Sequence, residues 1–63
     1  MKENRELFTD FCRENHVQES NVRDFAFNAL LNALEVNISD TQERSLLAGQ
    51  LMGRLGMYEV SNE

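Results

Sequence analysis

Two residues of this 63-residue chain have side chains suited to chemistry, its single cysteine, Cys12, and its single histidine, His16. They stand four positions apart, which makes them neighbours on a helix. Such a pair is typical of half a zinc site shared between two chains, or of a cysteine nucleophile activated by histidine. The zinc site needs a second pair from another chain, and the nucleophile needs an oxyanion stabiliser and a pocket. Because free cysteine commonly packs as a small hydrophobe, we predict no metal, no cofactor and no enzymatic activity.

Four carboxylates also share one side of the first predicted helix, and we call them the acidic stripe: Glu3, Glu6, Asp10 and Glu14. At about 100° per residue they fall within about 80° of one another. This spacing makes a surface row and does not bring two groups together in a cleft, and the sequence has no D-x-D-x-D-G calcium loop. We interpret the acidic stripe as a solvated face. A docking surface for a basic protein partner is the alternative.

The elements that carry these residues are predicted to be helices. The chain has no proline, and its apolar residues follow helical spacing over most of its length. We predict an all-α fold with three helices at about 2–15, 21–35 and 40–55. These helices form one compact domain over residues 1–63, and a short C-terminal tail from Met57 to Val60 folds back on it.

Several residues are predicted to begin or end these helices. Ser20 is expected to be the N-cap of the second helix, and Ser39 or Asp40 that of the third. Asn37 is expected to end the second helix in a left-handed conformation. Gly56 is expected to end the third helix, with Met57 making the accompanying apolar contact.

The second predicted helix is unusually apolar. Ten of the fifteen residues from Val22 to Val36 are apolar, and they cover about two thirds of the helix circumference. A surface helix usually has an apolar stripe little more than about 100° wide. Because a chain of this length has few neighbours to cover such a helix, we expect a homo-oligomer, with a dimer favoured. The predicted interface consists of Phe27, Leu30, Leu31, Leu34, Gly49 and Gly53.

The two glycines of that interface, Gly49 and Gly53, form a G-x-x-x-G pair on the third helix, and Ser45 extends the small-residue row. Each interior glycine costs a helix about 1 kcal/mol relative to alanine. We interpret the pair as a place where another helix backbone approaches closely, so that alanine destabilises at least one of the two positions. The alternative is that the glycines only loosen the helix, in which case alanine stabilises it.

The join between the second and third helices resembles the spacing of a helix-turn-helix DNA-binding unit. The resemblance rests on Ala33, Val36, Asn37, Ile38, Ser39 and Leu46. It implies a DNA-facing set made of Thr41, Gln42, Arg44 and Ser45. However, Glu43 stands where the pattern has an apolar residue, and Asp40 and Glu43 would face phosphates. A simple helical hairpin explains the same spacing, so a DNA-binding regulator is the alternative function.

Composition narrows the function classes further. The net charge is −5, from eleven acidic and six basic residues, and this sign disfavours nucleic acid and anionic membranes as partners. No apolar run approaches the ~20 residues that span a bilayer, and the N-terminus lacks the apolar core of a signal peptide. We therefore expect a cytoplasmic protein with Cys12 reduced. The function expected is that of a small acidic protein–protein interaction module, regulatory or inhibitory, as is typical of bacterial and phage accessory proteins.

Overall fold

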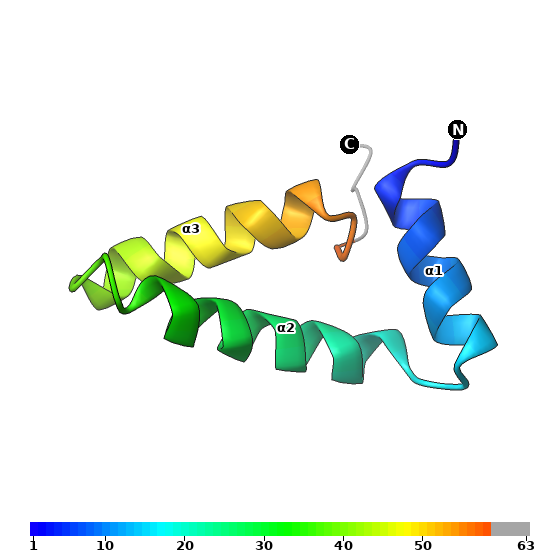
Figure 1. Cartoon of the computed structure of the whole chain (residues 1–63), viewed down its shortest axis with the longest axis horizontal. Helices are drawn as coiled ribbons and strands as arrows, with labels where there is room; N and C mark the ends of the chain where they lie inside the picture. Colours follow the sequence, from blue (N-terminus) through cyan, green and yellow to red (C-terminus); the bar gives the residue numbers. More distant parts are fainter. Residues whose placement is uncertain (59–63) are drawn as a thin grey trace.

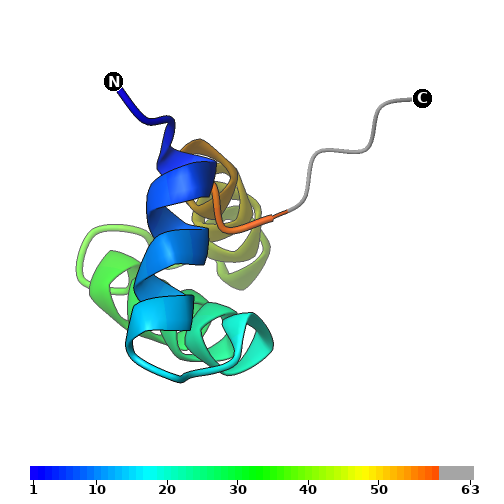
Figure 2. The same ribbon diagram turned by 90° about the vertical axis from the view of Figure 1, so that its right-hand side faces the viewer.

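The computed structural model describes residues 1–58, and over that range it contains three α-helices and no strand. They are α1 (Asn4–Glu14), α2 (Glu19–Leu34) and α3 (Thr41–Arg54). The all-α prediction is confirmed, and each helix begins and ends within two residues of its predicted bounds. α2 and α3 form an antiparallel hairpin that widens away from the 35–40 link, and α1 lies across its open end (Figures 1 and 2). The predicted tail from Met57 to Val60 lies partly outside the described residues.

α1 and α3 each end in the same type of hydrogen-bonded turn. After α3, the Met57 N–H donates to the Met52 carbonyl at 3.0 Å, and Gly56 has a φ of 74°. After α1, the Val17 N–H donates to the Cys12 carbonyl at 3.0 Å, and His16 has a φ of 57°. Both are Schellman turns, which need a left-handed residue directly after the cap. The prediction for Gly56 is confirmed, whereas the left-handed role of His16 was not foreseen.

Two other predictions about helix ends are wrong. α2 begins at Glu19 and its N-cap is Gln18, without a side-chain hydrogen bond, so Ser20 lies inside the helix. Asn37 is not left-handed; there the Ile38 N–H donates to the Leu34 carbonyl at 2.9 Å. The chain thus leaves α2 through one more right-handed turn, which needs no special residue.

The N-cap of α3 agrees with one of the two predicted residues. The side chain of Asp40 accepts a hydrogen bond from the Gln42 N–H at 3.1 Å. A carboxylate there satisfies a backbone donor that has no partner in the first helical turn and also meets the positive end of the helix dipole. This cap fixes where the chain turns back along α2.

The buried core is small. Among the described residues, the buried apolar side chains are Phe8 and Cys12 on α1 and Ala48 and Met52 on α3, while α2 contributes none. The radius of gyration is 12.9 Å, against about 10.6 Å for a compact domain of 63 residues. The three helices are thus arranged more openly than in a typical compact domain of this length. With α1 across the open end of the hairpin, the three helices enclose less volume than a parallel bundle would.

Candidate interaction surface

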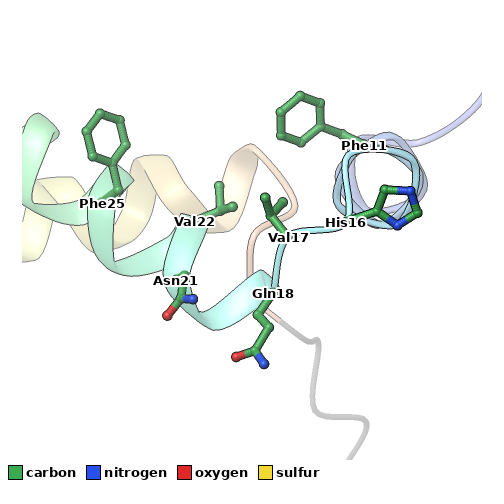
Figure 3. A pocket seen from close by; sticks show the side chains of 7 residues that line it. All are labelled: Phe11, His16, Val17, Gln18, Asn21, Val22 and Phe25. Atoms are coloured by element: carbon green, nitrogen blue, oxygen red, sulfur yellow. The ribbon is translucent and has the colours of Figure 1, made fainter.

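A notch lies where α1 meets the beginning of α2. It has a volume of about 620 Å³ and is lined by Phe11, His16, Val17, Gln18, Asn21, Val22 and Phe25. Figure 3 shows Phe11 and Phe25 on opposite sides of this notch, with Val17 and Val22 between them. Phe11 is 52% exposed and Phe25 is 74% exposed. Two exposed aromatic rings facing one space form an apolar surface that no other part of residues 1–58 covers.

The notch exists because of the turn after α1. His16 in its left-handed conformation reverses the chain between Glu14 and Glu19. This reversal sends α2 away from α1 and sets Phe11 and Phe25, fourteen residues apart, on facing elements (Figure 3). Helical spacing alone cannot predict that Phe11 and Phe25 face each other, because the two residues belong to different helices.

The apolar surface continues from the notch along α2. Val22, Phe25, Ala29, Ala33 and Val36 fall within about 80° on the helix, and we call them the α2 band. Val22 is half-buried and the other four are exposed; Val36, in the turn that follows α2, is 83% exposed. The three charged residues from position 20 to position 36 lie more than about 100° from the centre of the band. The band is therefore an uncharged apolar face of the kind found in the cores of interfaces.

The residues predicted for the oligomer interface have a different environment. Phe27, Leu30, Leu31 and Leu34 are half-buried, and on the helix they point away from the α2 band. Because α2 packs mainly along α3, we infer that this side faces α3 in the same chain. The wide apolar arc thus divides into one half that packs within the chain and one half that is exposed. An oligomer contact through the first half stays a prediction.

The glycines of α3 do not support close packing inside the chain. A Cβ atom added at Gly49 or Gly53 would meet no other side chain or segment of residues 1–58 within 4 Å. The close backbone approach occurs instead at Gly56, where a Cβ atom would lie 2.4 Å from the Arg5 backbone nitrogen. The open space at both positions leaves room for a helix backbone of a second chain, so their place in the oligomer interface stays a prediction.

Polar contacts at this end join all three helices. Arg5 of α1 donates to Glu19 at 3.0 Å and to the Gly56 carbonyl at 3.4 Å. Arg23 of α2 lies 3.5 Å from Glu19 and donates to the Met57 carbonyl at 3.4 Å. Cations at the C-terminal end of α3 also interact favourably with its dipole. We call Arg5, Glu19 and Arg23 the junction triad, and we assign it to positioning the helices.

The acidic stripe of α1 is partly occupied by contacts within the chain. Asp10 forms ion pairs with Lys2 and, at 2.6 Å, with Arg13. The hydrogen bond from Lys2 and then that from Arg13 lower the pKa of Asp10, while Asp10 raises the pKa of Lys2. Glu6 accepts a hydrogen bond from the Glu3 N–H at 3.2 Å. Glu3, Glu6 and Glu14 are exposed, so a reduced stripe remains available to a basic partner.

The residues predicted to face DNA are not arranged as in a helix-turn-helix unit that binds the major groove. Arg44 is half-buried and donates to the Ile38 carbonyl at 2.5 Å and to the Thr41 hydroxyl at 3.2 Å. α2 and α3 run back along each other as a hairpin (Figure 1), whereas the two helices of a helix-turn-helix unit cross at about 90–120°. Gln42 and Ser45 are exposed. This geometry gives the alternative no support.

Cys12 and His16 are not arranged as a chemical pair. Cys12 is buried, whereas His16 is exposed and lies beyond the end of α1. Within residues 1–58 no three acidic, histidine or cysteine side chains gather where they could hold a metal ion. The position of Cys12 agrees with its interpretation as a packing residue.

The comparisons add no family. Neither protein-family models, nor curated proteins, nor solved structures give a match to this chain. In the described part of the chain, no helix has the length and apolar character needed to cross a membrane.

Proposed function

We propose that this chain is a protein–protein interaction module that acts as a homo-oligomer and serves regulation. The observation that carries the proposal is the continuous apolar surface made by the notch and the α2 band. Phe25 and Val36, near the two ends of the α2 band, are 74% and 83% exposed. Contiguous exposed apolar surface of this kind marks interaction sites in proteins.

Sedimentation equilibrium at micromolar concentration tests this proposal. We expect a mass of at least twice 7.3 kDa. A monomer across the whole micromolar range would overturn the homo-oligomer. The measurement needs no knowledge of any other partner, and it can be made on the unmodified chain.

The acidic stripe supports a further role in binding a basic protein. Glu3, Glu6 and Glu14 are its exposed members and form no salt bridge with another residue of 1–58, whereas Asp10 is already paired with Lys2 and Arg13. A basic partner would thus meet a smaller charge than the sequence suggests. Such contacts mainly accelerate association and weaken with salt. The DNA-binding alternative is not favoured by any observation of the described residues.

A further inference from the structure

We propose that the occupant of the α2 band is a second copy of this chain, placed antiparallel across a two-fold axis near residue 31. The inference rests on the proposed function and specifies its interface. A two-fold interface uses the same surface on both copies, so its residues must complement themselves when the chain direction is reversed. The α2 band meets this requirement.

The order of side chains along the α2 band is what makes it self-complementary. Ala29 and Ala33 lie at its centre, while the larger Phe25 and Val36 lie near its two ends. Reversal about residue 31 places Ala29 against Ala33 of the second copy, and Phe25 against Asn37, next to Val36. Small residues at the crossing allow two helices to approach closely. The large residues then pack at both ends of the contact.

The notch also fits the antiparallel arrangement, because a side chain of the second copy can fill it. Phe25 belongs both to the notch and to the α2 band, and Val36 follows it by eleven residues, about 16 Å along a helix. In the antiparallel arrangement, Val36 of the second copy enters the notch between Phe11 and Phe25. The notch is thus completed by a residue from the other chain, and each copy fills the notch of the other.

Charge is compatible with this pairing. Each chain carries a net charge of −5, so two copies repel unless their acidic groups lie away from the contact. Asp24 and Glu35 lie on the opposite side of α2 from the α2 band, more than about 100° from its centre. The contact therefore buries neither of these two carboxylates, which avoids the desolvation cost of an unpaired charge.

Aspartate substitutions test the location of the interface. We expect Phe25→Asp and Val36→Asp each to raise the dissociation constant by about 100-fold or more, because each charge enters the symmetric interface twice. Leu46→Asp is the matched control, since Leu46 is 65% exposed on α3 and lies outside the α2 band. It should leave the dissociation constant within about threefold. Circular dichroism checks that all three variants keep their helices.

Cysteine cross-linking tests the antiparallel arrangement. A Phe25→Cys chain is mixed with a tagged Val36→Cys chain and oxidised, so that mixed and unmixed disulfide dimers differ in size. We expect the mixed dimer to predominate; Cys12 is buried and stays out of the reaction. Predominance of the two unmixed dimers would overturn the inference, because it indicates a parallel contact.

The experiments distinguish a wrong interface from a wrong proposed function. If the unmodified chain is an oligomer that survives Phe25→Asp and Val36→Asp but dissociates with Leu46→Asp, the interface is elsewhere. The inference is then wrong and the interaction module stands. If the unmodified chain is a monomer, both are wrong.

Discussion

His16 has an unfavourable backbone conformation that the turn after α1 requires. Its φ of 57° lies in the left-handed region, which costs an L-residue about 1–2 kcal/mol relative to glycine. The turn at His16 separates α1 from α2 and creates the notch. The strained residue therefore lies at the candidate interaction surface. Strained residues often cluster at such surfaces.

We therefore expect His16→Gly to raise the free energy of unfolding by about 0.5–1 kcal/mol, the relief of strain being partly offset by the flexible unfolded chain. His16→Ala is the control, because it removes the imidazole but keeps the Cβ atom, and it should give no such gain. Urea denaturation at one fixed protein concentration measures both variants. Equal gains from glycine and alanine would show that the imidazole, and not the backbone, carries the cost.

At the scale of the element, the glycines of α3 divide into two kinds. Gly53 and Gly49 have open space at their missing Cβ atoms, so Gly53→Ala should stabilise the chain by up to about 1 kcal/mol through better helix propensity. Gly56→Ala should destabilise it by more than about 2 kcal/mol, since the new Cβ atom meets the backbone of α1 and φ is positive. Thermal unfolding followed by circular dichroism distinguishes these outcomes. A loss of stability in Gly53→Ala would instead place a second chain on that face.

How far the elements could be predicted depends on whether the deciding contact is local. The N-cap of α3 depends on Asp40 and Gln42, two residues apart, and Asp40 is one of the two residues predicted for it. The first residue of α2, Glu19, interacts with Arg5, fourteen residues earlier, and local spacing does not predict this contact. Likewise, the division of the α2 arc into a packed and an exposed half depends on where α3 lies. Local spacing gives the width of the arc, and only the tertiary arrangement shows which half is exposed.

At the scale of the whole molecule, the junction triad holds together a structure with little core. The side chains of Arg5, Glu19 and Arg23 are each about 30% exposed, so their contacts are screened less than those of surface pairs. Glu19 forms ion pairs with both arginines, and those arginines in turn donate hydrogen bonds to carbonyl groups at the end of α3. Removing the charge of Glu19 therefore loosens α1 and α3 together, although Glu19 itself lies on α2.

We expect Glu19→Gln to lower the free energy of unfolding by about 1 kcal/mol, between the values typical of exposed ion pairs and of charged hydrogen bonds. Asp24→Asn makes the same change of charge on the same helix at an exposed position, and it should alter stability by less than about 0.5 kcal/mol. Urea denaturation at low and high salt checks both variants at equal protein concentration, since dimer formation makes stability depend on concentration. The stability lost in Glu19→Gln should persist at high salt, because its contacts are partly buried. Equal losses of stability in the two variants would mean that only the net charge affects stability. The junction triad would then not be what holds the three helices in their open arrangement.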